Sequence, residues 1–402
     1  MFFAKEKEIV TDDKKIDELL SRGVKDVFVM DSLRARLKSG KQLRVKLGFD
    51  PTGAQIHLGR AVILRKLREF QQLGHKVVFI IGDYTARIGD PSDKLNKRPM
   101  LTADKIEENL KDYKTQVGKI LDLKSIEFRR NSEWLKQLGF SEIAELAESF
   151  SVQQMSNRRN FKERFEKGEE VSLREFLYPL MQGYDSVAIG ADIEIGGFDQ
   201  LFNLKAGRII QRHYGKTEQD VLTGKMLPGM DGRKMSTSWG NVVNVVDSQD
   251  EMFGKIMSLR DELIGDYFEL CTDVAMEEVT LIRKDLAGGL LHPKEAKTRL
   301  AFEITGLYHG KEVAEEARDR FREVFQGGGM PEDAPQVKPN DGEDLASLLL
   351  RVGIVKSKSD FRRLLNEGAL ERVGHGNIED LKAMPVSGSA YKIGKRRFIK
   401  II

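Results

Sequence analysis

The sequence predicts an α/β protein with a doubly wound parallel sheet, followed by an all-α region and a small α+β module. Short apolar strands alternate with amphipathic helices through residues 1–246, the pattern of a parallel sheet covered by helices. Strand signals stop in 247–325, and the glycine- and proline-rich stretch 326–343 has the composition of a linker. Helix and strand patterns both return in 344–402. We therefore expect four segments with these boundaries.

One strand–turn–helix unit organises the first segment. Apolar and basic residues alternate over 43–47, the period of a strand, and the turn residues 50–53 follow. A helix is expected to begin near His57 and to end at Gly74. This geometry points backbone N–H groups and a positive dipole end at a phosphate. An ordinary βα unit with a satisfied histidine is the alternative.

The other elements of this segment follow from their apolar periods. Helices are expected over 12–20 and 29–38, before the first strand. The continuous apolar run 76–82 predicts a central parallel strand, and the polar loop 83–92 follows it where such sheets bind ligands. The remaining expectations, in order, are helix 103–121, strand 126–128, helix 134–150, an exposed insertion at 157–170, helix 176–185, strand 193–195 and helix 201–213.

Composition narrows the class of protein. Forty per cent hydrophobic and 32% charged residues are typical of a soluble globular chain. No apolar run approaches the roughly 18 residues that span a membrane, and the first residues do not resemble a signal peptide. The single cysteine, Cys271, excludes an internal disulfide and is compatible with a reducing compartment. The histidines have no metal-ligand spacing, so we expect a cytoplasmic protein without a protein-built metal site.

The charge is unevenly distributed. The net charge is +3, yet residues 343–402 carry 12 Lys/Arg against 7 Asp/Glu, a net of +5. Helices expected over 345–352 and 360–366 are followed there by short strands. A basic tail after a linker indicates an appended nucleic-acid-binding module. A solvated basic surface without a partner is the alternative.

Several residues suit the activation of a carboxylic acid by ATP. In that reaction the acid attacks the α-phosphorus and negative charge builds on the phosphates, so positioning and positive charge supply the rate. Magnesium enters with ATP as part of the substrate. The polar candidates are His57, Lys94, Arg98, Asp199 and Lys234, and the glycines that allow a nucleotide to approach the backbone are Gly48, Gly59 and Gly197.

Two motifs carry a resemblance to a known family. His57-Leu58-Gly59-Arg60 is similar to the HIGH element of class I aminoacyl-tRNA synthetases, and Lys234-Met235-Ser236-Thr237-Ser238 is similar to their KMSKS loop. The resemblance implies a Rossmann-like catalytic domain in which His57, Arg60, Lys234 and Thr237 act on the phosphates. It further implies that the ATP site includes Asp50, Pro51, Thr52, Met235, Ser236 and Ser238.

Further motifs resemble the tyrosyl-tRNA synthetases. Tyr178-x-x-x-Gln182-x-x-Asp185 is similar to the helix that holds tyrosine in that family, with Tyr178 and Gln182 near the amino group and Asp185 on the phenol. Gly196-Gly197-Phe198-Asp199-Gln200 looks like the family's G-G-x-D-Q turn, and Asp90 resembles the aspartate that pairs with the ammonium. The implied tyrosine pocket is completed by Lys46, Thr85, Asn131 and Gln200.

The family also implies the partners. Its helical middle recognises the anticodon region of tRNA(Tyr), its chains form homodimers, and many bacterial members end in a small RNA-binding module. The expected RNA contacts in the tail are Lys356, Lys358, Arg362 and Arg363.

Four positions depart from the family pattern. Arg60 replaces the second histidine of HIGH, Thr237 replaces the second lysine of KMSKS, Lys46 stands where some members have tyrosine, and Phe198 is bulkier than expected. The predicted function is ligation of tyrosine to tRNA through tyrosyl-adenylate. The alternatives are a tryptophanyl relative and a binding paralogue that has lost catalysis.

Overall fold

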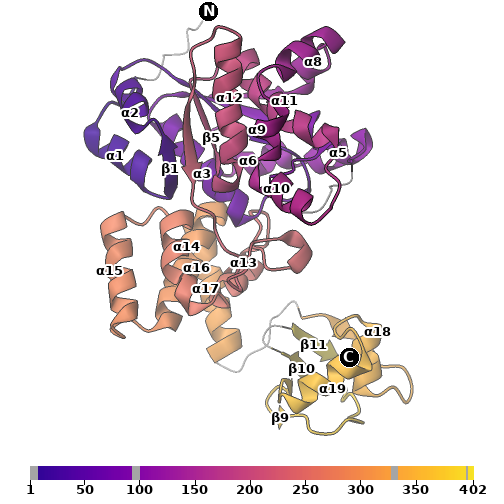
Figure 1. Cartoon of the computed structure of the whole chain (residues 1–402). Coiled ribbons are helices and arrows are strands. Elements are labelled where there is room, and N and C mark those ends of the chain that lie inside the picture. Colours follow the sequence, from indigo (N-terminus) through magenta and orange to yellow (C-terminus); the bar gives the residue numbers. More distant parts are fainter. Residues whose placement is uncertain (1–7, 93–99, 327–333, 395–396) are drawn as a thin grey trace, which may run out of the picture. The chain divides into compact units, whose positions relative to one another are not determined.

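The computed structural model describes residues 8–92, 100–326, 334–394 and 397–402 (Figure 1). The chain divides into two compact units: Met1–Asp247 with Leu259–Ala296, and Ser248–Ser258 with Lys297–Ile402. The helical stretch expected at 247–325 is therefore shared between them. None of the described helices is long and apolar enough to span a membrane.

The first unit is built on a six-stranded sheet with the order β1-β6-β5-β2-β3-β4. All neighbours are parallel except β1 and β6, which are antiparallel. The strands are β1 Val24–Phe28, β2 Arg44–Phe49, β3 Lys76–Ile81, β4 Ile126–Arg130, β5 Ile193–Gly197 and β6 Asp220–Gly224. The predicted α/β class is thus confirmed, although strands β1 and β6 were not predicted.

The described helices divide into those before and those after residue 247. Those before residue 247 are α1 Asp13–Ser21, α2 Met30–Lys38, α3 Leu58–Gln72, α4 Thr85–Ile88, α5 Ala103–Leu110, α6 Tyr113–Gly118, α7 Ser132–Leu135, α8 Phe140–Ala147, α9 Val152–Ser156, α10 Arg159–Glu166, α11 Leu173–Ile189 and α12 Leu201–His213. Those after it are α13 Gln249–Met257, α14 Ile264–Cys271, α15 Met276–Ala287, α16 Pro293–His309 and α17 Lys311–Gln326. The 3₁₀ turns are η1 Phe198–Gln200, η2 Thr237–Trp239 and η3 Asp261–Leu263.

Three expectations for helices need correction. The single helix expected at 103–121 is two helices, α5 and α6, and the one expected at 134–150 is divided between α7 and α8. The exposed insertion expected at 157–170 contains α10, whose Phe161 and Arg164 are buried. Arg164 forms an ion pair with the buried Glu175 of α11, which explains why a basic stretch packs inside.

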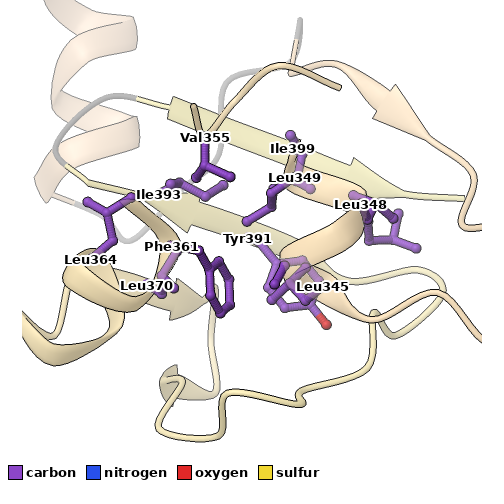
Figure 2. Close-up of a cluster of buried hydrophobic side chains, with 12 residues drawn as sticks. Leu345, Leu348, Leu349, Val355, Phe361, Leu364, Leu370, Tyr391, Ile393 and Ile399 are labelled. Carbon is purple, nitrogen blue, oxygen red and sulfur yellow. The ribbon is translucent and has the colours of Figure 1, made fainter. Parts of the chain in front are cut away.

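The C-terminal module has its own core. Its elements are β7 Gln336–Val337, α18 Leu345–Arg351, α19 Lys358–Asn366, β8 Leu370–Arg372, β9 Gly376–Asn377, β10 Ala390–Ile393 and β11 Arg397–Ile401. Figure 2 shows side chains of α18, α19 and the strands packed together, including Leu348, Phe361, Tyr391 and Ile399. β7 pairs in parallel with β11, so part of the stretch expected as linker at 326–343 belongs to this sheet.

Candidate active site

A cavity of about 710 Å³ lies at the carboxyl ends of β2, β5 and β6. β2 and β5 are neighbours in the sheet although β3 and β4 lie between them in the chain. The order in which successive strands are added to the sheet therefore reverses between β2 and β5. Ligands of open α/β sheets bind at such a switch point. The predicted site residues that line the cavity are Gly48, Asp50, Thr52, His57, Gly59, Arg60, Asp90, Tyr178, Gln182, Gly197, Asp199, Gln200, Lys234, Met235, Ser236, Thr237 and Ser238.

His57 is the N-cap of α3. Its Nδ1 accepts a hydrogen bond from the backbone N–H of Arg60 at 3.4 Å, so the proton of the neutral ring belongs on Nε2. Burial, and then the charge of Arg60, lower the pKa of His57 to about 4. The ring is therefore neutral at pH 7 and retains one N–H with which to donate to a ligand.

The backbone N–H groups of the first turn of α3 are already engaged. Leu58 N–H donates to the carbonyl of Val243 at 2.8 Å, and Gly59 N–H donates to Sδ of Met235 at 3.2 Å. Arg60 N–H is bound to His57. The expectation that this turn offers free N–H groups is therefore wrong for the structure as it stands. A phosphate would have to displace Met235 to reach Gly59.

Arg60 is fixed by two side chains and a ring. Its guanidinium donates to Tyr113 Oη at 3.1 Å and to Thr52 Oγ1 at 2.6 Å, and it lies 5.7 Å from the ring centre of Phe49. This anchoring holds a permanent positive charge at the cavity wall.

The loop that carries Lys234 is held by Asn241. The side-chain oxygen of Asn241 accepts from the N–H of Ser236 at 2.9 Å, and its nitrogen donates to the carbonyl of Lys234 at 3.1 Å and to Asp231 at 2.8 Å. Lys234 and Thr237 are exposed, whereas Met235 is buried. The loop therefore has a defined backbone while its cation faces solvent and the cavity.

Asp185 is buried behind the cavity wall. Its carboxylate accepts from the indole N–H of Trp134 at 2.8 Å and from the amide of Asn131 at 3.4 Å. Burial is the main cause that raises the pKa of Asp185 to about 7, and Lys46 acts in the opposite direction. With a pKa near 7, this carboxyl group can be either protonated or ionised at neutral pH, so it can donate a hydrogen bond to a ligand hydroxyl or accept one from it.

A chain of hydrogen bonds joins Asp185 to the cavity. The amide of Asn131 also donates to Thr85 Oγ1 at 3.0 Å, and Thr85 donates to Asp50 Oδ1 at 2.7 Å. This contact needs a glycine at position 82, because a Cβ there would clash with Asp50 Oδ1. The two groups of residues predicted for ATP and for tyrosine thus meet at Asp50.

Asp90 lies in a second polar cluster at the cavity wall. It accepts from Gln200 at 2.8 Å and from Asn203 at 3.4 Å. Arg158 donates to Asn203 at 3.1 Å, and its charge lies near Asp90. Burial lowers the pKa of Arg158 to about 10, which leaves it charged at pH 7. A cationic ligand group would meet an ordered carboxylate here.

Some predicted residues lie elsewhere. Lys94 and Arg98 fall outside the described residues. Pro51 is buried, and its carbonyl accepts from Asn109 at 2.8 Å. Lys46 is also buried, with its ammonium bonded to protein groups.

The basic residues predicted for RNA lie around the start of α19. Lys356, Lys358 and Arg362 are exposed. Arg363 is exposed as well, but it pairs with Asp360 at 2.7 Å and with Glu367 at 2.9 Å.

Further residues act on the predicted ones and were not expected from the sequence. Trp134, Arg158, Glu194, Asn203 and Asn241 contact predicted site residues or the loop that carries them. No short motif marks them, because each meets its partner only in the folded chain. A polar residue inside an apolar strand, as at Glu194, was the one signal available.

The chain resembles known proteins along almost its whole length. Residues 38–326 match the family described as tRNA synthetases class I (W and Y). The tyrosine–tRNA ligase of Moorella thermoacetica is 45% identical over 95% of this chain and 94% of its own. That of Thermotoga maritima is 44% identical over 96% of each chain.

Solved structures agree with the fold. A C-terminally truncated mitochondrial tyrosyl-tRNA synthetase from Aspergillus nidulans superposes with a TM-score of 0.64 and 22% identity, covering 77% of this chain and 94% of its own. The tyrosyl-tRNA synthetase of Archaeoglobus fulgidus complexed with L-tyrosine gives a TM-score of 0.60 at 22% identity, covering 76% of this chain and 99% of its own. The chain therefore belongs to the class I tRNA synthetases of the W and Y family, among the bacterial-type tyrosyl-tRNA synthetases.

Proposed function

We propose that this enzyme activates L-tyrosine with ATP in the 710 Å³ cavity and then transfers the tyrosyl group to the 3′ end of tRNA(Tyr). A carboxylate oxygen of tyrosine attacks the α-phosphorus, and the bond to pyrophosphate breaks. No protein base is required, because the attacking carboxylate is already ionised. Magnesium arrives with ATP and is part of the substrate. The working form is a cytoplasmic homodimer.

Three residues act on the phosphates. His57 donates its Nε2–H to a phosphate oxygen, a role that its neutral tautomer supports. Arg60 supplies a fixed charge at the wall, and Lys234 reaches the leaving pyrophosphate from its loop. Asp199 accepts from the ribose hydroxyls. Their contribution is charge and orientation at the point where negative charge develops.

The tyrosine site uses groups of opposite character at its two ends. Asp90, Tyr178 and Gln182 receive the ammonium, and Asp185 receives the phenol hydroxyl. The proposal rests on one observation above all: Asp185 is buried yet joined through Asn131 and Thr85 to Asp50 on the cavity wall. A site built to bond a phenol rejects phenylalanine, because its polar group is then left unpaired, and tyrosyl-tRNA synthetases are the well-known example of this discrimination.

The test is pyrophosphate exchange with each of the twenty amino acids. Tyrosine alone should support exchange at low concentration. Asp185→Asn keeps the shape but removes the carboxylate, so it should weaken tyrosine activation and narrow the gap between tyrosine and phenylalanine. Exchange with tryptophan would identify the tryptophanyl relative instead. No exchange with any amino acid, from a folded protein, would favour the binding paralogue.

A further inference from the structure

A buried ion pair lies beneath the helix that carries Gln182. Lys46 on β2 and Glu194 on β5 are both fully buried, and Nζ of Lys46 is 2.9 Å from Oε1 of Glu194. Burying two charges costs several kcal/mol per ion, and replacing such a pair by apolar residues is often neutral or stabilising. Stability alone therefore gives no reason for charges at these positions.

Lys46 has no donor left for a ligand. A lysine ammonium carries three N–H donors. They go to the carbonyl of Gln182 at 2.7 Å, to Ser186 Oγ at 2.8 Å and to Glu194. The expectation that Lys46 contacts tyrosine directly is not supported by this arrangement. Its contacts hold the backbone of α11 instead.

Glu194 sets the orientation of the Gln182 side chain. Its Oε1 accepts from Nε2 of Gln182 at 3.1 Å, and its Oε2 accepts from Ser186 at 3.2 Å and from Gln219 at 2.5 Å. An amide has one donor end and one acceptor end. With the nitrogen bound to Glu194, the carbonyl oxygen of Gln182 is the end that serves a ligand at the cavity.

The fold keeps room for this carboxylate. Gly207 on α12 packs against it, and a Cβ at that position would clash with Nε2 of Gln219 and lie 3.1 Å from Oε2 of Glu194. Partners from β2, from α11 and from the residue before β6 thus converge on one carboxylate. Such convergence fixes a rotamer more firmly than a single hydrogen bond does.

We propose that Glu194 is a positioning residue for substrate recognition: it holds the amide of Gln182 so that its carbonyl oxygen accepts from the α-ammonium of the amino acid. Lys46 balances the charge of Glu194 and fixes the same turn of α11 through the Gln182 carbonyl. This inference rests on the proposed function and deepens it, since it makes a residue outside the cavity wall position the Gln182 side chain that receives the ammonium.

The test is Glu194→Gln in the full-length enzyme. A glutamine can present its own NH₂ group to Gln182, so the amide is no longer held in one orientation. KM for tyrosine should rise roughly ten-fold or more, the size expected for a hydrogen bond to a charged group, whereas KM for ATP and kcat should stay within about two-fold. A matched control is Glu175→Gln, which breaks another buried ion pair of α11, with Arg164 at 2.5 Å. It should leave KM for tyrosine unchanged.

Binding of two substrate analogues isolates the ammonium. Tyrosinol keeps the α-ammonium and phenol, whereas 3-(4-hydroxyphenyl)propanoate lacks the ammonium. Glu194→Gln should weaken tyrosinol binding by a factor similar to the rise in KM, and it should leave propanoate binding unchanged. Equal weakening of both analogues would overturn the proposal, because it would indicate a general disturbance of the pocket.

The outcomes separate this inference from the proposed function. Wild-type exchange with tyrosine and an unchanged KM in Glu194→Gln would overturn the inference alone. Failure of the wild type to activate tyrosine would overturn both. If Glu194→Gln does not fold, the uncharged double variant Lys46→Gln/Glu194→Gln replaces it. The double variant should show the same selective loss of tyrosinol affinity, and a wild-type affinity would again overturn the proposal.

Discussion

The hydroxyl of Tyr178 donates a 2.9 Å hydrogen bond to Oδ2 of Asp50, which joins α11 to the turn that precedes α3. Burial raises the pKa of Tyr178 well above its usual range, so this hydroxyl remains a donor. Thr85 occupies the other oxygen of the same carboxylate at 2.7 Å. Asp50 therefore links the site proposed for the nucleotide to the site proposed for the amino acid.

Tyr178→Phe and Asp50→Asn should affect the two substrates together. Tyr178→Phe removes the donor of the 2.9 Å bond, and Asp50→Asn removes the charge and one of the two acceptor oxygens that Tyr178 and Thr85 use, so KM for tyrosine and KM for ATP should both rise. Because the residues are in contact, the double variant should lose less than the sum of the single losses, by about 1 kcal/mol in kcat/KM. Exchange kinetics of the four proteins check this. Additive losses would mean that the bond does not link the sites.

Asp185 should make stability depend on pH. Burial raises its pKa to about 7, so between about pH 4 and pH 7 the folded chain holds a proton that the unfolded chain has released. Its contribution to stability is therefore fully present at low pH and is lost as pH rises through this window. The wild type should lose stability relative to Asp185→Asn by up to about 1.4 kcal/mol per pH unit.

Denaturant titrations of both proteins from pH 4 to pH 8 measure this difference. Other titrating groups cancel, because the two chains share them. A constant difference across the range would show that Asp185 is ionised in the folded enzyme throughout. Bound tyrosine should reduce this pH dependence of stability, because its phenol supplies a hydrogen-bond partner to Asp185.

His57→Asn separates the two roles of the histidine. Asparagine is a good N-cap, so the variant keeps the cap of α3 but loses the Nε2–H. Adenylate formation should fall by on the order of 3 kcal/mol in activation free energy, with little change in stability. His57→Ala should lose the same rate and, in addition, about 1 kcal/mol of stability. Single-turnover rates and melting curves distinguish them. A wild-type rate of adenylate formation in His57→Asn would show that the Nε2–H of His57 does not act on the phosphates.

Arg60→His restores the usual family motif, yet it should lower activity. The guanidinium bonds Thr52 and Tyr113 at once, and an imidazole cannot span both partners. It would also leave the buried hydroxyl of Tyr113 without this bond. A reduced exchange rate and a lower melting temperature are expected. A faster enzyme would show instead that Arg60 limits the chemistry.

Local patterns predicted the parts of this enzyme that are continuous in the sequence. The unit from β2 to α3 and helix α11 have strong apolar periods, so their motifs could be assigned to elements. β1 and β6 were missed because their sequences, Val-Lys-Asp-Val-Phe and Asp-Val-Leu-Thr-Gly, show neither a continuous apolar run nor a strict alternation. Glu194, Trp134 and Asn241 were missed for another reason, because their importance depends on partners from other elements. Lys46 was found, but its three bonds to protein groups could not be foreseen.

Removal of the tail should separate chemistry from RNA binding. A chain that ends at Gln326 lacks β7 as well as the module it joins, so the sheet is removed whole. Residues assigned to ATP and tyrosine remain, and pyrophosphate exchange should continue near the full-length rate. Aminoacylation should fall sharply, since residues 343–402 carry a net charge of +5 that attracts the phosphate backbone. The deficit should shrink at low salt. If the truncated and the full-length enzyme aminoacylate tRNA equally well at moderate salt, the tail does not serve in RNA binding.

Arg362 and Arg363 should contribute unequally to tRNA affinity. Both are exposed on α19, but Arg363 pairs with Asp360 and Glu367 of its own helix region. Those carboxylates partly neutralise it, and binding a phosphate would require breaking or sharing the pairs. Arg362→Ala should therefore raise KM for tRNA several-fold and reduce the salt dependence by about one phosphate contact, whereas Arg363→Ala should change it less. Tyrosine and ATP kinetics, which do not involve this helix, are the internal control. The reverse order would mean that tRNA binding releases Arg363 from its carboxylates.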